Sequence, residues 1–98
     1  MKLKELLTKL EYKVVKGSDT IEVSHLQNDS RKVSDGDAFV CIKGAGFDGH
    51  EFIKAAFDLG ASAVLTQRDT ELLVDKTIVK VEDTLKAFGD IAKYYKQK

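Results

Sequence analysis

The sequence contains no proline, no tryptophan and only one cysteine among its 98 residues. Without proline, no turn depends on a cis X-Pro bond. The single cysteine, Cys41, cannot form an internal disulfide, and its position inside an apolar stretch is typical of a buried, unreactive thiol. Neither a disulfide nor a reactive cysteine is therefore expected.

An excess of charge and a long apolar run are also absent. Sixteen basic residues balance sixteen acidic ones, so the composition gives no indication of binding to a nucleic acid polymer. No apolar run approaches the roughly 20 residues that cross a bilayer, and the N-terminus lacks the apolar stretch of a secretion signal. We expect a cytoplasmic protein that binds neither a nucleic acid polymer nor a membrane.

The two histidines show no spacing that is typical of a metal site. His50 has an Asp and a Glu nearby but no second ligand at metal spacing, and His25 lies in a strand pattern. The order of Ser, His and Asp residues supports no catalytic arrangement either. We expect no metal site and no catalytic residue in this chain.

The composition is that of one small globular domain. Apolar residues make up 43% of the chain and charged residues 33%. A chain of 98 residues buries roughly two thirds of its unfolded surface, but is too short for two separate cores. We predict a single domain over residues 1–98, with a single core.

Apolar spacing predicts an α/β fold with a mixed sheet. Residues 12–15 and 21–26 are expected to form two strands around a turn at 17–19, as a small antiparallel or edge element. Further strands are expected over 38–43, 61–66 and 77–81. A helix between the strands at 38–43 and 61–66 requires a right-handed crossover, so these two strands are predicted to be parallel neighbours.

Helical spacing occurs in three places that flank these strands. Leucines at positions 3, 6, 7 and 10 predict a short helix at the start of the chain. A second helix, over residues 50–59, is expected to stop at Gly60; its buried face is predicted from Phe52, Ile53, Ala56 and Phe57. A last helix begins at Asp83 or Thr84 and is marked by Leu85, Phe88, Ala92 and Tyr95.

The loop after the central strand carries glycines at positions 44, 46 and 49. This Gly-x-Gly-x-x-Gly pattern, with Asp69 about 20 residues later, fits a dinucleotide fingerprint. Phe47 opposes that interpretation because its large side chain stands where a pyrophosphate would approach, and Asp48 adds a negative charge.

A structural role for the same loop is a helix cap. Asp48 is expected to cap the following helix, with Glu51 reaching back as in a capping box. The turns of the loop explain two glycines comfortably and three less so. The third glycine indicates a ligand that approaches the main chain.

Four blocks, in order and with compatible spacing, resemble the N-terminal domain of the Mur ligases. These ATP-dependent enzymes add amino acids to the peptide of UDP-N-acetylmuramic acid in peptidoglycan synthesis, and so serve cell wall biogenesis, cell shape and cell division. The blocks are residues 28–33, 36–44, 48–53 and 60–64, and the resemblance extends over the whole chain.

Within this family, two ligases are the nearest in sequence pattern. Residues 1–7 and 39–44 look most like the ligase that adds the third residue, meso-diaminopimelate or L-lysine, to UDP-N-acetylmuramoyl-L-alanyl-D-glutamate. Residues 83–87 and 92–95 look closer to the ligase that adds D-alanyl-D-alanine. We favour the first, and keep the second as an alternative.

The resemblance implies that this domain binds the UDP part of the nucleotide sugar, while later domains bind ATP, Mg and the incoming amino acid. Carried onto this chain, the family's contacts fall on Asn28, Ser30, Ala45, Gly46 and Phe47. Position 28 is commonly Leu or Thr in such enzymes, so a contact at Asn28 requires its main chain.

Uridine chemistry agrees with this assignment. Phe47 offers a flat apolar surface, the loop offers main-chain amides, and Ser30 offers a hydroxyl. Arg31 and Lys43 are candidates for the diphosphate, although each also fits a solvated surface charge. Asp48 and His50 complete the set of candidate substrate-binding residues.

No Gly-x-x-x-x-Gly-Lys-Ser/Thr string, which would bind ATP phosphates, occurs in this sequence. We therefore expect a domain without a cofactor of its own that folds alone but catalyses no ligation. Its expected partners are the UDP-N-acetylmuramoyl peptide and, in cis, the ATPase and C-terminal ligase domains that are absent here. The alternative is an interaction module that keeps the fold but has lost the ligand, for which Asn28 is the only support.

Overall fold

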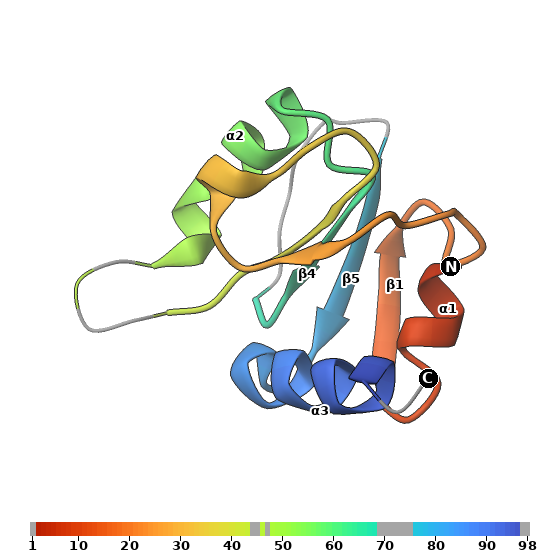
Figure 1. Cartoon of the computed structure of the whole chain (residues 1–98). Coiled ribbons are helices and arrows are strands. Elements are labelled where there is room, and N and C mark those ends of the chain that lie inside the picture. The colour runs from red at the N-terminus through yellow and green to blue at the C-terminus, as the bar shows by residue number, and fades with distance from the viewer. Residues whose placement is uncertain (1, 44–45, 47, 69–75, 97–98) are drawn as a thin grey trace.

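A mixed β-sheet organises the chain (Figure 1). The computed structural model describes residues 2–43, 46, 48–68 and 76–96, with side chains as far as Lys93. Within these residues five strands form one sheet, in the order β1-β5-β4-β3-β2. The strands are β1 (Tyr12–Lys16), β2 (Leu26–Gln27), β3 (Ala38–Val40), β4 (Ala63–Thr66) and β5 (Thr77–Val81).

The pairs β2–β3, β3–β4 and β4–β5 are parallel, and β1 pairs antiparallel with β5. The mixed sheet and the parallel pair β3 and β4 are thus confirmed. The expected turn-linked pair over residues 12–26 is wrong, because β1 and β2 lie at opposite edges of the sheet. The strand predicted over 21–26 is reduced to the short β2, whose neighbour is β3.

Helices precede, connect and follow the strands. Gly60 has a φ of +104°, a conformation that favours glycine, and it follows the second α-helix as predicted. In the described part of the chain, no helix is long and apolar enough to span a membrane. The helices are α1 (Leu3–Leu6), α2 (Ile53–Asp58) and α3 (Thr84–Lys96), with short 3-10 helices η1 (Ser30–Lys32) and η2 (Gly49–Phe52).

The buried side chains form two clusters, one on each face of the sheet, where a single core was predicted. Alternate residues of a strand point to opposite faces. Ala38 and Val40 therefore pack in the cluster that includes residues of α1 and α3, whereas Phe39 packs in the cluster that includes residues of α2. Figure 1 shows α2 well separated from α1 and α3. The chain is nevertheless one domain, because both clusters share the sheet.

Helix α3 starts where predicted but turns a different face inward. Asp83 accepts a hydrogen bond from the main-chain N–H of Lys86 at 3.2 Å, which caps the helix start. The residues buried from α3 include Thr84, Ala87 and Ile91, whereas Leu85 is 64% exposed. The assignment of Leu85 to the buried face of the helix was thus wrong. Positions 84, 87 and 91 have helical spacing and form the buried stripe without it.

We expect Leu65→Ala to lower the free energy of unfolding by about 2–5 kcal/mol, because Leu65 is fully buried and its truncation leaves a cavity. Leu85→Ala removes the same atoms from an exposed side chain and should change the free energy of unfolding by less than about 0.5 kcal/mol. Urea denaturation followed by circular dichroism measures both values. Equal losses in the two variants would contradict this account of the core.

Candidate functional site

The segments that follow β2 and β3 meet at one edge of the sheet, because these strands are parallel neighbours. In open α/β sheets, ligands bind outside the carboxyl ends of the parallel strands. This edge carries a groove of about 500 Å³. Its lining residues are Asn28, Asp29, Ser30, Arg31, Lys32, Phe39 and Phe52.

Three of the predicted ligand-binding residues, Asn28, Ser30 and Arg31, line this one groove. Asn28 directly follows the end of β2, with one intervening position before η1 begins at Ser30. Asn28 is exposed and Ser30 is half-buried. The fold therefore gathers the polar groups after β2 on a single concave surface.

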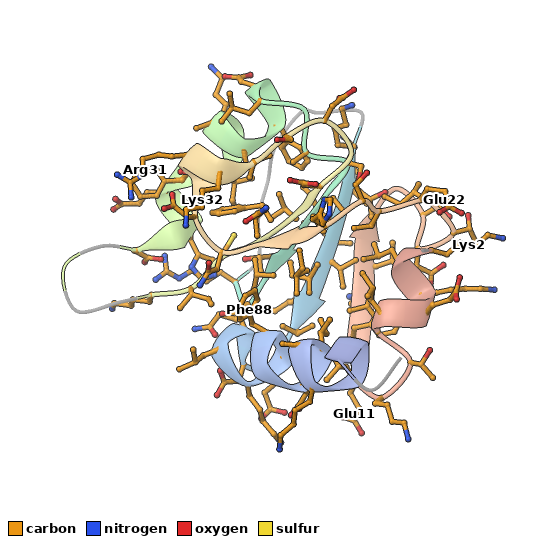
Figure 2. All side chains as sticks on the ribbon, viewed as in Figure 1. Lys2, Glu11, Glu22, Arg31, Lys32 and Phe88 are labelled. Carbon is orange, nitrogen blue, oxygen red and sulfur yellow. The ribbon has the colours of Figure 1, made fainter. Side chains whose placement is uncertain are left out.

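Asp29 shapes the turn that carries these residues. Its carboxylate accepts hydrogen bonds from the main-chain N–H of Arg31 at 3.0 Å and from the guanidinium at 3.1 and 3.0 Å. These bonds and the positive charge lower the pKa of Asp29 from its ordinary value. The Arg31 side chain is 87% exposed, and Figure 2 shows Arg31 and Lys32 at the outer side of η1.

The glycine loop after β3 is closed by a β-bridge between Lys43 and Asp48. Gly49 donates its N–H to the main-chain oxygen of Ile42 at 2.9 Å, and a Cβ on Gly49 would lie 2.7 Å from the nitrogen of Ile42. The close approach of two main chains therefore requires this glycine. Gly46 differs, because no atom beyond its own residue and its two chain neighbours lies within 4 Å of the position of its Cβ.

The predicted contacts at Ala45 and Phe47 lie outside the described residues, as do Gly44 and Asp69. The dinucleotide alternative can still be compared with the fold. From β2 through β5 the order of the described strands follows the chain without a reversal. Dinucleotides bind doubly wound sheets at the point where strand order reverses, so this topology does not support that alternative.

Asp48 caps η2, in agreement with its predicted role. One carboxylate oxygen accepts from the main-chain N–H of His50 at 3.0 Å and pairs with the His50 Nδ1 atom at 2.7 Å. The other accepts from the guanidinium of Arg68. The side chain of Asp48 bonds the amide of His50, and the amide of Glu51 donates to the main-chain oxygen of Asp48 at 3.0 Å; the return contact from the Glu51 side chain stays a prediction.

These contacts set the charge of Asp48. Its loss of hydration alone would raise the pKa of the carboxyl group. The hydrogen bonds from His50 and Arg68, together with the Arg68 charge, outweigh that effect and lower the pKa of Asp48 to about 2. Asp48 is therefore ionised throughout the neutral range, as a partner for Arg68.

The polar atoms of Asp48 and His50 are engaged within the protein, and neither residue is among those that line the groove. The His50 side chain is 5% exposed, and its Nε2 atom lies 3.3 Å from the main-chain nitrogen of Gln67. Lys43 is exposed next to the loop. Of these three residues and Arg31, only Arg31 lines the groove itself.

Sequence reasoning missed three residues at this edge, namely Phe52, Gln67 and Arg68. Phe52 was placed on the buried face of the helix, but it is 38% exposed and lines the groove. Ile53, Ala56 and Phe57 form a complete buried stripe without Phe52, and this spacing could have indicated that Phe52 is exposed. Gln67 and Arg68 follow β4 and gave no signal, because only the sheet brings Gln67 to His50 and Arg68 to Asp48.

Cys41 is fully buried, which confirms its predicted setting. Burial and the charge of Asp48 raise the pKa of the thiol to about 12, against a smaller opposing effect of Arg68. The thiol is therefore protonated and unreactive at neutral pH. Among the described residues, no group of three His, Cys, Asp or Glu side chains is placed to hold a metal ion.

Comparison with known sequences gives consistent matches. A family model described as "Mur ligase family, catalytic domain" matches residues 22–96. The UDP-N-acetylmuramoyl-L-alanyl-D-glutamate–2,6-diaminopimelate ligase of Clostridium perfringens is 44% identical over 95 residues, which are 97% of this chain and 20% of that protein. The ligase of the same name from Listeria monocytogenes is 37% identical, over 97% of this chain and 19% of that protein. The chain thus spans about a fifth of the length of these relatives.

Solved structures give the same fold. The MurF ligase from Thermotoga maritima, in complex with ADP, matches with a TM-score of 0.64 and 35% identity, over 74% of this chain and 16% of that one. MurF from Acinetobacter baumannii matches with a TM-score of 0.75 over 98% of this chain and 21% of that one. Its identity is 22%, so this second match supports the fold alone.

We expect Gly49→Ala to destabilise the fold by about 1–3 kcal/mol, because the added Cβ would meet the main chain of Ile42. Gly46→Ala is the matched control and should leave the free energy of unfolding within about 0.5 kcal/mol of the wild type, since open space surrounds that position. Thermal and urea unfolding measure both. A Gly49→Ala variant as stable as the control would show that the approach to Ile42 is not required.

The ionised Asp48 should stabilise the fold in a pH-dependent way. Its pKa is about 2 in the folded chain and ordinarily 3.8, so its contribution is present above 3.8 and is lost as the pH falls toward about 2. We expect Asp48→Asn to be less stable than the wild type at neutral pH, with a difference that shrinks over this acid range. Asp58→Asn, at an exposed position of α2, is the control in the same urea titrations. A difference for Asp48→Asn that does not change with pH would contradict the assignment.

Proposed function

The chain belongs to the Mur ligase family, as its N-terminal domain, and on that premise we propose that it binds the UDP part of UDP-N-acetylmuramoyl-L-alanyl-D-glutamate. The observation that carries this proposal is the groove at the carboxyl ends of β2 and β3. It gathers polar groups, an exposed aromatic ring and two cationic side chains within reach of one ligand.

The base of the nucleotide needs a flat apolar contact and a few hydrogen bonds. Phe52 supplies an exposed ring on the groove wall. On the same surface, Ser30 supplies a hydroxyl and Asn28 supplies main-chain groups. Gly46 is open to approach, which suits recognition through the main chain of the loop.

The diphosphate needs positive charge that remains accessible. Asp29 engages the Nε and one terminal nitrogen of the Arg31 guanidinium, which has five N–H donors in total. The exposed remainder of the guanidinium can therefore bind phosphate oxygens while Asp29 keeps the side chain in place. Lys32, on the groove, and Lys43, beside the loop, add exposed charges near this edge.

The ligase reaction is assigned to a longer protein, since the relatives are about five times the length of this chain. Their names describe ligases that act on UDP-N-acetylmuramoyl-L-alanyl-D-glutamate and 2,6-diaminopimelate. We assign the parent protein to this reaction, with ATP and Mg bound by further domains in cis. The sequence matches favour this enzyme over the one that adds D-alanyl-D-alanine, because the 44% identity extends over nearly the whole chain.

We expect UDP to bind this chain and to shift the NMR signals of Asn28, Ser30, Gly46 and Phe52. Ser30→Ala should weaken UDP binding about three- to tenfold, since one hydrogen bond is removed. Ser24→Ala is the matched control, because Ser24 is exposed before the amino end of β2. Isothermal titration gives the affinities.

Shifts confined to other parts of the chain, or no binding at millimolar UDP, would overturn the proposal and favour an interaction module. The same protein given ATP, the UDP-linked dipeptide and the diamino acid should form no product. Product formation would show that these 98 residues are themselves a ligase.

A further inference from the structure

A continuous chain of polar contacts joins the end of the glycine loop to the turn after β4 and to the start of α3. Asp48 pairs with His50 Nδ1 at 2.7 Å and accepts from the guanidinium of Arg68. The main-chain N–H of Gln67 donates to His50 Nε2 at 3.3 Å. The side-chain oxygen of Gln67 accepts from the N–H and the hydroxyl of Thr84, both at 3.1 Å. Three segments that are distant in sequence are thereby fixed to one another.

The turn after β4 is itself held in place. The buried hydroxyl of Thr66 accepts from the main-chain N–H of Arg68 at 3.2 Å and donates to its carbonyl oxygen at 3.3 Å. This turn therefore offers Gln67 and Arg68 as fixed partners for the loop. Because the His50 side chain is 5% exposed and that of Asp48 is 16% exposed, water replaces a lost partner poorly.

The contacts of His50 determine which of its nitrogens carries the proton. A main-chain N–H can only donate, so Nε2 must present its lone pair to Gln67. The proton of the neutral ring then lies on Nδ1 and is donated to Asp48. The opposite tautomer would direct two N–H groups at each other and would leave Asp48 without this donor.

His50 and Asp48 stand at the closing end of residues 44–47. The bridge between Lys43 and Asp48 and the bond from Gly49 to Ile42 set where this segment begins and ends. Neither His50 nor Asp48 lines the groove. Their geometry suits anchoring of the loop better than direct contact with a ligand.

We propose that His50, as the neutral Nδ1–H tautomer, is a positioning residue for the ligand-binding loop. It ties Asp48, and with it the closing end of residues 44–47, to the turn after β4. This inference rests on the proposed function, in which the loop contacts the nucleotide. A loop whose ends are fixed before the ligand arrives loses less conformational entropy on binding, so the anchor strengthens binding without touching the ligand.

Two substitutions separate the hydrogen bonds of His50 from its volume. His50→Phe keeps an aromatic ring but loses both bonds, whereas His50→Gln can again accept from the N–H of Gln67. His25→Gln is the matched control, because the His25 side chain is 78% exposed and a glutamine can still donate to the carboxylate of Asp37, which lies 3.6 Å from His25 Nδ1. All three variants and the wild type are compared as the full 98-residue chain.

The first experiment tests, without ligand, whether His50 anchors the loop. It measures the hydrogen-exchange rates of main-chain amides. We expect His50→Phe to speed exchange of the Gly49 amide by about tenfold or more, with a smaller effect in His50→Gln and none in His25→Gln. The Cys41 amide, which donates to Leu65 in β4, reports on the sheet and should change less than the Gly49 amide. Nitrogen NMR of the wild-type ring should show the proton on Nδ1.

The second experiment tests the positioning role by measuring UDP affinity in titrations. We expect His50→Phe to weaken UDP binding about tenfold, His50→Gln to recover part of the loss, and His25→Gln to bind as the wild type does. A wild-type chain that does not bind UDP would refute the proposed function. The hydrogen-exchange data would still decide whether His50 anchors the loop.

Three results would overturn the inference. The first is a wild-type ring with its proton on Nε2. The second is equal acceleration of the Gly49 and Cys41 amides in His50→Phe, which would indicate a general loss of stability. The third is normal UDP affinity in His50→Phe alongside a wild type that binds UDP.

Discussion

Parallel pairing of β3 on both sides is the constraint on which the rest of this structure depends. Ala38 is in register with Leu26 of β2 and with Ala63 of β4, so the segments after these strands emerge at one edge. All three residues of β3 are buried, because parallel strands are covered on both faces. That coverage requires helices on each side and therefore two apolar clusters. The turn after β2 and the bridge between Lys43 and Asp48 therefore lie at the same end of the sheet as a consequence of this register.

The local pattern of apolar residues was enough to predict those strands and helices that do not depend on a partner distant in sequence. Strand β5 coincides with the predicted strand over 77–81, and the parallel relation of β3 and β4 follows from the helix between them. Local pattern could not predict the pairing of β1, because its partner β5 lies near the other end of the chain. A turn signal at residues 17–19 indicated a local hairpin, but the long-range pairing with β5 prevails.

The candidate site was predictable where the residues that line the groove carry their own signal. Asn28, Ser30 and Arg31 follow a strand and lie on one groove, and three glycines in one loop indicated exposed main chain. Phe52 was misplaced because helical spacing does not decide which side of a short 3-10 turn faces solvent. Gln67 and Arg68 could not be found from local pattern, since their contacts depend on the end of β4 lying beside His50 and Asp48.

A group near the glycine loop is open to a ligand only if no contact inside the protein already engages it. Gly49 is used by the main chain of Ile42, and the carboxylate of Asp48 is used by His50 and Arg68. A ligand gains little from groups that would have to break such bonds first. Gly46 and the ring of Phe52 remain open to it. Since the chain has no net charge to attract an anionic nucleotide from a distance, the nucleotide binding proposed above rests on the placement of these open groups. A loop end fixed at the same end of the sheet supports that proposal.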